Sequence, residues 1–200
     1  MKIVLASNNA HKLEELRAIL SQLGLEVVSQ KEMGITIEPD ENGTSFEENS
    51  YIKAKAIQDA CHMATIADDS GLMVDALDGA PGILSARFGG EACKSDRDRL
   101  EYLLERLSGV EDADRGAKFV SVITLLYPDG KKLVARGECP GTILHQAVGD
   151  NGFGYDPIFY VPECGCTFAQ LSAEEKNAIS HRARALAALR DLLLKEKNVC

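Results

Sequence analysis

The chain has no long apolar run and little positive charge for its length. Its first apolar stretch, residues 1–6, is too short for the apolar part of a signal peptide or for a membrane span. Lysine and arginine total 22 against 31 aspartates and glutamates, giving a formal net charge of −9. Such a charge disfavours a protein that coats nucleic acid or an anionic membrane. We therefore expect a cytoplasmic protein with neither partner, in which local cations or a metal bind any anionic ligand.

Cysteine pairs at metal-site spacing are also missing. The six cysteines are dispersed, and the one close pair, Cys164 and Cys166, has no second Cys or His pair at zinc-site spacing. We expect reduced thiols and no structural zinc. No internal repeat, low-complexity tract or long linker divides the chain, and 200 residues suffice for one substantial core. We therefore predict a single domain over residues 1–200.

The N-terminal half alternates short apolar runs with amphipathic segments. The expected order is strand, helix, strand, helix and strand, over residues 2–6, 12–23, 26–29, about 44–61 and 64–67. Thr44 with Glu47, or Ser45 with Glu48, offers a capping box for the second helix. The last of these strands is predicted to end just before Asp68-Asp69-Ser70-Gly71, at the edge where open α/β sheets bind ligands.

The C-terminal half predicts an antiparallel addition to that sheet. A helix is expected over about residues 95–107, and residues 119–127 and 132–139 flank Pro128-Asp129-Gly130 as a hairpin. A final amphipathic helix is expected from Arg182 onward. The chain is therefore predicted to form an α/β fold with a mixed rather than a wholly parallel sheet.

Residues 7–12 lie between the first strand and the first helix. Backbone N–H groups, the helix dipole and a lysine at such a place can hold phosphate oxygens. The segment lacks the glycines of a Walker loop or a dinucleotide fingerprint, so an Asn-rich turn that caps a helix is the alternative interpretation. The candidate phosphate ligands are Ser7, Asn8, Asn9, Ala10, His11 and Lys12.

Carboxylates occur close to two neighbouring elements. Glu41 lies in the acidic loop 38–43, and Asp68 and Asp69 follow the predicted third strand. Magnesium takes one or two carboxylates and leaves the rest of its octahedron to water and phosphates. The pattern indicates a Mg²⁺ site, although a solvated loop acid explains Glu41 equally well. Lys53 on the second helix could neutralise phosphate, the alternative being an ordinary solvated lysine.

Residues 152–157 place an aromatic ring between two glycines with an acid beside it. Phe153 could stack on a purine while Asp156 contacts the edge of the base. A tight turn that packs Phe153 and Tyr155 into the core explains the same pattern equally well. No G-x-S-x-G elbow supports Ser70 as a nucleophile, so covalent catalysis is the poorer interpretation.

A polar cluster follows near the C-terminal helix. Lys176 is separated from His181 and Arg182 by five or six residues, and an unbroken helix would not place these three on one face. A turn near Ser180 is needed for them to act together. Without that turn they are ordinary solvated charges.

Taken together, four separated segments resemble the inosine/xanthosine triphosphate pyrophosphatases, the Ham1-like family that removes non-canonical purine nucleotides. They occur in order over nearly the whole chain, and Asn8 is a departure because many relatives have glycine there. The segments are Ser7-x-Asn9-x-x-Lys12, Phe46-x-x-Asn49 with Lys53-Ala54, Ala67-Asp68-Asp69-Ser70-Gly71-Leu72, and Phe153-Gly154-Tyr155-Asp156-Pro157 with Glu175-Lys176 and Ser180-His181-Arg182.

The resemblance implies an elongated α/β fold with a central mixed sheet flanked by helices, two lobes with an active-site cleft between them, and a homodimer. It also implies Mg²⁺-dependent hydrolysis of ITP, dITP, XTP and dXTP to the monophosphate and pyrophosphate, which keeps these nucleotides out of DNA and RNA.

The resemblance also assigns roles to individual residues. Glu41 and Asp69 are the implied metal ligands, and Asp69 is the implied proton acceptor for the attacking water. The implied substrate-binding residues are Ser7, Asn8, Asn9, Ala10, His11, Lys12, Lys53, Ser70, Phe153, Gly154, Tyr155, Asp156, Lys176, His181 and Arg182.

The residue chemistry agrees with these roles, because hydrolysis of a phosphoanhydride needs positioned water, a base and charge neutralisation. A donor from the cluster of His181 and Arg182 would favour the 6-oxo group of hypoxanthine or xanthine over the 6-amino group of adenine. Two alternatives stay open: a phosphatase or nucleotidyl-transferring enzyme, and a non-catalytic nucleotide sensor. The pair Asp68-Asp69 disfavours the sensor, since unshielded acids weaken polyanion binding unless a metal is present.

Overall fold

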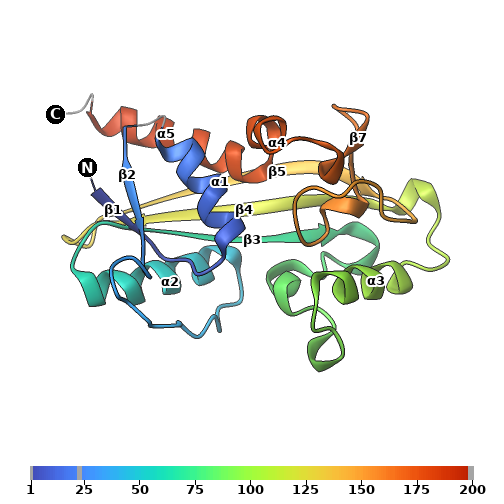
Figure 1. Cartoon of the computed structure of the whole chain (residues 1–200), viewed down its shortest axis with the longest axis horizontal. Coiled ribbons are helices and arrows are strands. Elements are labelled where there is room, and N and C mark those ends of the chain that lie inside the picture. The colour runs from blue at the N-terminus through green and yellow to red at the C-terminus, as the bar shows by residue number, and fades with distance from the viewer. Residues whose placement is uncertain (1, 22–23, 198–200) are drawn as a thin grey trace. The chain divides into compact units, whose positions relative to one another are not determined.

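The computed structural model describes residues 2–21 and 24–197, apart from the side chains of residues 11, 19, 196 and 197. In this part of the chain seven strands form one mixed sheet, in the order β2-β1-β3-β4-β5-β6-β7 (Figure 1). The predicted α/β fold with a central mixed sheet and flanking helices is confirmed. None of the described helices combines the length and apolarity that a membrane span requires.

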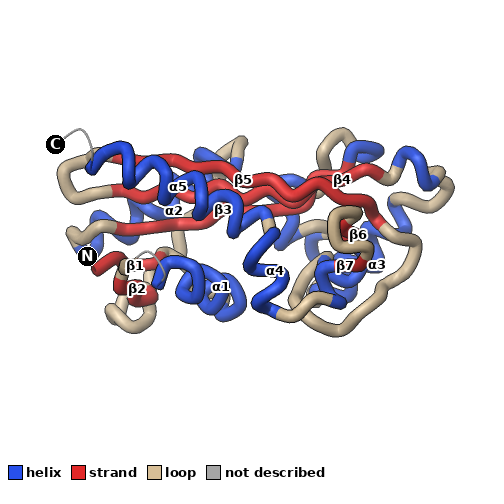
Figure 2. The backbone as a smooth tube through the Cα atoms, turned by 90° about the horizontal axis from the view of Figure 1, so that it is seen from above, coloured by secondary structure: helices blue, strands red, loops and turns tan. Residues whose placement is uncertain are grey.

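The strands pair in both directions. Strand β1 (Lys2–Leu5) pairs in parallel with β2 (Glu26–Ser29) and with β3 (Thr65–Val74), whereas β6 (Phe159–Val161) pairs antiparallel with both of its neighbours. The remaining strands are β4 (Gly116–Leu126), β5 (Lys132–Ile143) and β7 (Cys166–Thr167). In Figure 2, β3, β4 and β5 are the long neighbouring strands. The predicted hairpin is formed by β4 and β5 with the turn at residues 127–131.

The helices are α1 (Ala10–Ser21), α2 (Phe46–Cys61), α3 (Asp96–Arg106), α4 (Ala173–Ile179) and α5 (His181–Lys197). Short polar side chains begin three of them, because a hydroxyl oxygen can accept the otherwise unpaired N–H groups of a first turn. Ser45 accepts from the Glu48 N–H at α2, and Ser95 and Ser172 form complete capping boxes at α3 and α4. Of the two capping boxes predicted for α2, the N-cap at Ser45 is present, but the Glu48 carboxylate accepts from Thr44, so the reciprocal bond of the box is made one residue earlier.

The chain divides into two compact units. Unit 1 comprises Met1–Asp69, Ser121–Gly137 and His181–Cys200, and unit 2 comprises Ser70–Val120 and Glu138–Ser180. Strands β3, β4 and β5 contribute residues to both. The prediction of one domain over residues 1–200, and those of an elongated outline and a cleft, stay predictions.

In unit 1 the apolar residues of β1 pack on both faces of the sheet. Successive side chains of a strand point to opposite faces. Ile3 and Leu5 accordingly join the core cluster that contains residues of α1 and α5, whereas Val4 joins the cluster that contains residues of α2. Figure 1 shows α2 on one side of these strands and α1 and α5 on the other. Strand β3 is covered on both faces in the same way, by Ile66 toward α1 and α5 and Ala67 toward α2.

Unit 2 has a core of its own. Leucines of β3 and α3 pack there against three phenylalanine rings, one each from β4, β6 and position 168. The rings of Phe119 and Phe159 meet edge to face, with centroids 4.6 Å apart, and Phe168 stacks on Phe119 at 5.8 Å. Such contacts fix the aromatic side chains beyond what burial alone would do.

The prediction that β3 ends at Ala67 is wrong. The strand continues to Val74, so Asp68-Asp69-Ser70-Gly71 lies within it rather than beyond its end. Charged residues usually mark the end of a buried strand, because an unpaired buried charge is costly. Here cations from other elements pair with both acids, as described below, and β3 keeps β1 and β4 as neighbours.

Strand β5 is also longer than predicted, ending at Ile143 instead of at residue 139. Pro140 and Gly141 argued against this continuation in the sequence, because both residues are rare within strands. A Cβ on Gly141 would lie 2.5 Å from the ring of Phe159, so glycine is needed for the close approach of β6. Helix α1 begins at Ala10 rather than at residue 12, and residues 22–23 of the predicted helix lie outside the described residues.

Candidate active site

Asp68 and Asp69 are adjacent on β3 and contact different groups. Asp68 is on the same face of β3 as Ile66, which packs toward α1 and α5. Asp69 is on the same face as Ala67, which packs toward α2. Both are buried, with 3% and 5% of their surface exposed. Because of this alternation, the sheet separates two carboxylates that are neighbours in sequence.

Asp68 is surrounded by cations and a hydroxyl. Lys12 Nζ lies 2.9 Å and the Arg182 guanidinium 3.3 Å from Asp68 Oδ2, and the Ser121 hydroxyl donates to Oδ1. Burial alone would raise the pKa of Asp68, but Arg182, Lys12 and Ser121 outweigh it and hold this pKa well below the usual value. Asp68 is therefore a counter-ion that is charged at neutral pH. Arg182 also pairs with Glu15 of α1.

Asp69 shares one lysine with Glu41. Lys53 Nζ lies 2.6 Å from Asp69 Oδ1 and 3.0 Å from Glu41 Oε2. Burial raises the pKa of Asp69, and the opposing attraction of Lys53 does not cancel this effect. Burial also acts on Glu41, but there the charge of Lys53 prevails and the pKa is lowered. Of the two carboxylates, Asp69 is thus the one more ready to accept a proton.

The second oxygen of Asp69 is the most informative atom of this group. Asp69 Oδ2 is buried and has no hydrogen-bond partner among the residues that the structure describes. Leaving a buried acceptor unpaired costs about 1–3 kcal/mol. A site that binds a ligand at this oxygen would explain why the cost is tolerated.

Glu41 and Asp69 together fit a divalent cation such as Mg²⁺. They offer hard oxygen ligands, and Asp69 Oδ2 has no hydrogen-bond partner among the described residues. No group of three or more potential metal ligands occurs within the described part of the chain. Magnesium needs only one or two protein carboxylates, because water and phosphate complete its shell.

The segment 7–12 is an Asn-rich turn that caps α1. Asn9 Oδ1 accepts from the Lys12 N–H at 3.1 Å, and Ser7 Oγ accepts from the Asn9 N–H at 3.2 Å. The Asn8 amide reaches Glu38 at 3.5 Å. Residues 8–10 are exposed and α1 has no acid in its first turn, so the positive end of the helix dipole is not offset there. The side chain of His11 lies outside the described part of the structure.

In unit 2, residues 152–156 form a tight turn around Asp156. Asp156 Oδ2 accepts from the Phe153 N–H at 2.8 Å and from Lys176 Nζ at 2.7 Å. Gly152 has a φ of +74°, and a Cβ there would lie 2.1 Å from Asp156 Oδ2, so only glycine fits. The Gly154 N–H donates to Asp96 at 3.0 Å.

The two aromatic residues of this turn differ. Tyr155 is buried in the core, where its hydroxyl donates to the Ser85 carbonyl at 2.9 Å. Burial raises the pKa of this phenol. Phe153 is only half-buried, and the Lys176 ammonium lies 4.7 Å from its ring centroid. Core packing, one of the two interpretations of the pattern, thus holds for Tyr155, while Phe153 remains accessible for stacking.

The turn expected near Ser180 is present. Helix α4 ends at Ile179, Ser180 is extended with ψ 161°, and α5 begins at His181. Lys176 and Ser180 belong to unit 2, and His181 and Arg182 to unit 1. All four are buried. Ser70, the first residue of unit 2, is half-buried on β3.

Sequence reasoning missed Glu15 and Ser121. Glu15 follows Lys12 by one helical turn, which places both on one side of α1 and was a usable signal. Ser121 lies in β4, 53 residues from Asp68, and only the folded sheet brings the two together.

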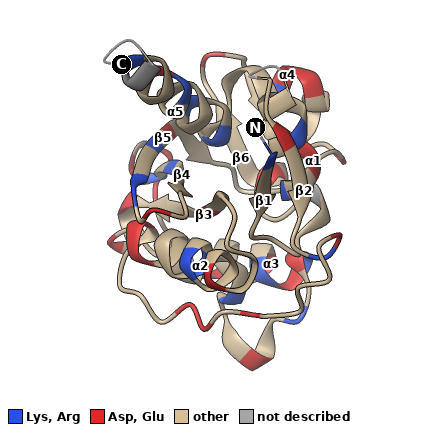
Figure 3. Cartoon of the chain, turned by 90° about the vertical axis from the view of Figure 1, so that its left-hand side faces the viewer, with Lys and Arg blue, Asp and Glu red and all other residues tan. Residues whose placement is uncertain are grey.

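Helix α2, which carries Lys53, has charges of both signs. In Figure 3, α2 carries both basic and acidic residues. One ion pair on this helix joins Lys55 and Asp59. Such surface pairs contribute little to stability.

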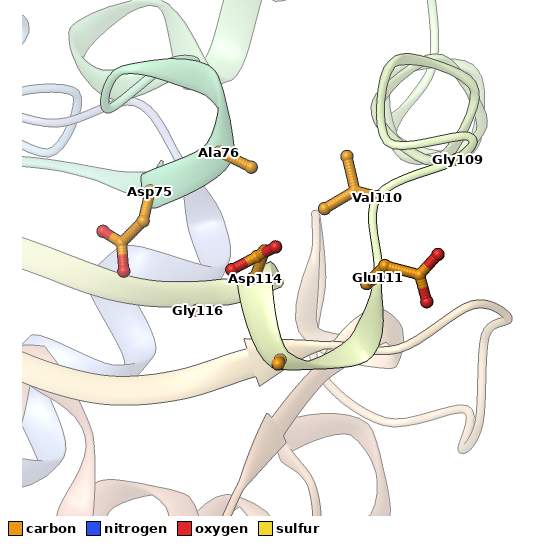
Figure 4. Close-up of a pocket in the computed structure, with 8 residues that line it drawn as sticks. Asp75, Ala76, Gly109, Val110, Glu111, Asp114 and Gly116 are labelled. Carbon is orange, nitrogen blue, oxygen red and sulfur yellow. The ribbon is translucent and has the colours of Figure 1, made fainter.

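A pocket of about 650 Å³ in unit 2 contains none of the predicted site residues (Figure 4). Three of its lining residues are the acids Asp75, Glu111 and Asp114. Carboxylates at that density repel a polyanion. We therefore do not assign a nucleotide to it.

Known proteins resemble the chain over almost its full length. The family model described as the Ham1 family matches residues 3–192. A Clostridium perfringens protein named dITP/XTP pyrophosphatase is 48% identical, with 96% of this chain and 97% of that protein covered.

Two solved structures are also similar. A Ham1 protein from Staphylococcus aureus has a TM-score of 0.86 and 44% identity, with 98% of this chain and 100% of that one covered. A HAM1 protein from Coxiella burnetii has a TM-score of 0.87 and 41% identity, with 98% and 99% covered.

Proposed function

Because the chain belongs to the Ham1 family, we propose that it hydrolyses the non-canonical purine nucleotides ITP, dITP, XTP and dXTP to the monophosphate and pyrophosphate. This activity removes such nucleotides before polymerases can use them. The observation that carries the proposal is the buried Oδ2 of Asp69, which has no hydrogen-bond partner in the described part of the chain although Asp69 shares Lys53 with Glu41.

Asp69 is the proton acceptor of this reaction. Its Oδ2, which has no hydrogen-bond partner among the described residues, can accept a hydrogen bond from the attacking water, as a general base must. The water attacks the α-phosphorus as its proton moves toward Asp69, and pyrophosphate leaves. Little covalent chemistry is asked of the protein, so positioning and charge neutralisation supply most of the effect.

Glu41 and Asp69 hold a divalent cation, which we propose to be Mg²⁺. When bound, the ion neutralises charge on the phosphate oxygens. Lys53 and Lys12 supply further positive charge from α2 and α1. Burial lowers the pKa of Lys12 against the opposing charge of Asp68, and the nearby cations Lys53 and Arg182 lower it further. A phosphate beside Lys12 would therefore stabilise the charged form of this lysine.

Phe153 stacks on the purine, and Lys176 is the donor that the observed contacts favour for its 6-oxo group. An ammonium has three N–H donors. Asp156 anchors that of Lys176 against the Phe153 ring, beside the proposed position of the base. Adenine offers a 6-amino donor instead, so ATP would leave that N–H unpaired. The remaining substrate contacts are proposed at Ser7 through His11, Ser70, Gly154, Tyr155, His181 and Arg182, and the active form as a homodimer.

A panel of triphosphates with product identification tests the proposal. We expect dITP and XTP to release pyrophosphate in the presence of Mg²⁺, with kcat/KM at least about tenfold above that for ATP or dGTP. Equal values for all four would contradict the selectivity. Orthophosphate or a transferred nucleotide would indicate the phosphatase or transferase instead, and binding without turnover would indicate a sensor.

Asp69→Asn is the variant that tests the mechanism. It keeps the shape of the side chain but removes the base, so turnover should fall by at least about 100-fold in a folded protein. Asp59→Asn is the matched control, because Asp59 is exposed and its carboxylate pairs with Lys55 on the surface of α2. Turnover of Asp69→Asn near the wild-type rate would exclude this base.

A further inference from the structure

Asn49 lies one helical turn before Lys53 on α2 and is completely buried. Residues four apart on a helix lie on the same side. Asn49 therefore lies on the side of α2 from which Lys53 reaches Glu41 and Asp69. The proposed mechanism gives it no role, although a buried carboxamide needs a reason to replace an apolar side chain.

The oxygen of this carboxamide holds the loop that carries Glu41. Asn49 Oδ1 accepts from the Gly43 N–H at 2.9 Å, two residues after Glu41. A Cβ on Gly43 would lie 2.7 Å from that oxygen and 2.8 Å from the Cβ of Glu48, so the loop approaches α2 this closely only with glycine. Because the Gly43 N–H is a donor, the atom that faces it must be the oxygen, which sets the orientation of the amide.

Side chains of α2 thus hold the short segment 41–43 at both ends. Lys53 pairs with the carboxylate of Glu41, and Asn49 binds the backbone of Gly43. The next residue is also fastened, since Glu48 accepts from Thr44 N at 2.6 Å and Thr44 Oγ1 at 2.9 Å. The position of the Glu41 carboxylate therefore depends on α2, although Glu41 itself lies in a loop.

The nitrogen of the same carboxamide is buried as well. Asn49 Nδ2 has no hydrogen-bond partner among the residues described by the structure. Burying an unpaired amide is unfavourable, so the residue is not there for stability alone. Lys53, one turn further along, joins Glu41 to Asp69, whose Oδ2 is likewise buried and unpartnered.

We propose that Asn49 is a positioning residue for metal binding: by holding Gly43, it keeps Glu41 beside Asp69 so that both carboxylates can bind one divalent cation. This inference rests on the metal site of the proposed function. It adds that Asn49 and Gly43 determine the affinity of that site without contacting the ion. Partners behind metal ligands typically change the affinity roughly 10- to 100-fold when they are removed.

Mn²⁺ binding to the nucleotide-free protein, followed by the electron paramagnetic resonance of the free ion, tests the proposal without relying on activity. Glu41→Gln serves as the reference for a lost ligand. We expect Asn49→Leu and Gly43→Ala to weaken Mn²⁺ binding at least about tenfold. Asn49→Asp keeps the oxygen that Gly43 needs and should bind at least as tightly as the wild type.

Ser45→Ala is the matched control, because it removes the N-cap of the same helix but leaves the contact between Asn49 and Gly43 intact. Its Mn²⁺ affinity should equal that of the wild type. An equal loss in Ser45→Ala would overturn the proposal, since helix stability alone would then be the cause.

Wild-type affinity in Asn49→Leu, or a loss in Asn49→Asp as large as that in Asn49→Leu, would also overturn it. Should Asn49→Leu fail to fold, Gly43→Ala decides the same contact from the loop side. An unchanged affinity in Glu41→Gln would overturn this inference together with the metal assignment. The release of pyrophosphate from dITP tests the proposed function separately.

Discussion

Asp68 and Asp69 are consecutive residues of β3, yet Asp68 pairs with Lys12 and Arg182 while Asp69 pairs with Lys53. The alternation of the strand thereby gives two identical side chains different environments. Asp68 has a lowered pKa and Asp69 a raised one, although burial acts on both in the same direction. The difference comes from the number of cations that each one meets. We therefore expect the first acid to serve stability and the second to serve chemistry.

The first prediction concerns the stability of Asp68→Asn. The substitution removes the counter-ion that the partly buried Lys12 shares with the buried Arg182, and Arg182 keeps only its pair with Glu15 from among the ion pairs described above. Breaking a buried pair costs about 3–5 kcal/mol. Urea denaturation should show that loss in the free energy of unfolding. Asp59→Asn removes the exposed partner of Lys55 and should change it little. Equal stability of the two variants would contradict a structural role for Asp68.

The second prediction is how the difference in unfolding free energy between the wild type and Asp68→Asn depends on pH. The folded protein lowers the pKa of Asp68, so the ionised form stabilises the fold above the unfolded pKa, about 3.9. That contribution is lost as the pH falls from there through the lowered folded pKa. The gap in unfolding free energy between wild type and Asp68→Asn should stay constant from about pH 7 to 5 and shrink below about pH 4. A gap that widens in acid would show the opposite sign.

Local patterns predicted those parts of the fold that depend on neighbouring residues. The strand at residues 26–29 and the end of α2 at Cys61 match the structure, because turn chemistry and helix capping act within a few residues. The end of β3 was placed wrongly at Ala67. Its continuation depends on Lys12, Lys53 and Arg182, which are remote in sequence from the acids they pair with.

The candidate site could be predicted in its residue types but not in its pairings. A joint role for Lys176 and His181 required a turn near Ser180, with solvated charges as the alternative, and the structure has a break between the two helices at Ser180. Nothing local distinguishes Ser121 from any other serine in a strand, although its hydroxyl binds Asp68. Asn49 was visible within a motif, but its contact with Gly43 depends on the path of the acidic loop.

The third prediction is the titration of Asp69 in the metal-free protein. Burial raises its pKa above the ordinary value, and Lys53 opposes that rise. Lys53→Met should therefore raise the pKa of Asp69 further, because the opposing cation is lost. Carbon-13 NMR of the labelled carboxyl groups measures both values. Lys55→Met, which removes an exposed lysine of the same helix, should leave the titration unchanged.

Magnesium should shift the same titration in the opposite direction. A metal ligand must be deprotonated to bind, so adding Mg²⁺ should lower the pKa of Asp69 in the wild type. Glu41→Gln should weaken this effect. A titration that does not respond to Mg²⁺ at any concentration would contradict Asp69 as a ligand.

The last prediction separates recognition of the base from recognition of the phosphates. Phe153 is half-buried with Lys176 against its ring, whereas Tyr155 of the same turn is tied to Ser85 inside unit 2. Phe153→Leu should lose base stacking, about 1–3 kcal/mol per base. At about 1.4 kcal/mol per factor of ten, kcat/KM for dITP should fall by roughly 5- to 150-fold.

The inhibition constant of pyrophosphate is the internal control for Phe153→Leu, because pyrophosphate carries no base and is proposed to contact the metal, Lys53 and residues 7–12 rather than Phe153. It should stay at the wild-type value. Weaker inhibition by pyrophosphate together with the loss for dITP would mean that the substitution disturbs the whole site, and stacking on Phe153 would then be excluded as the specific cause.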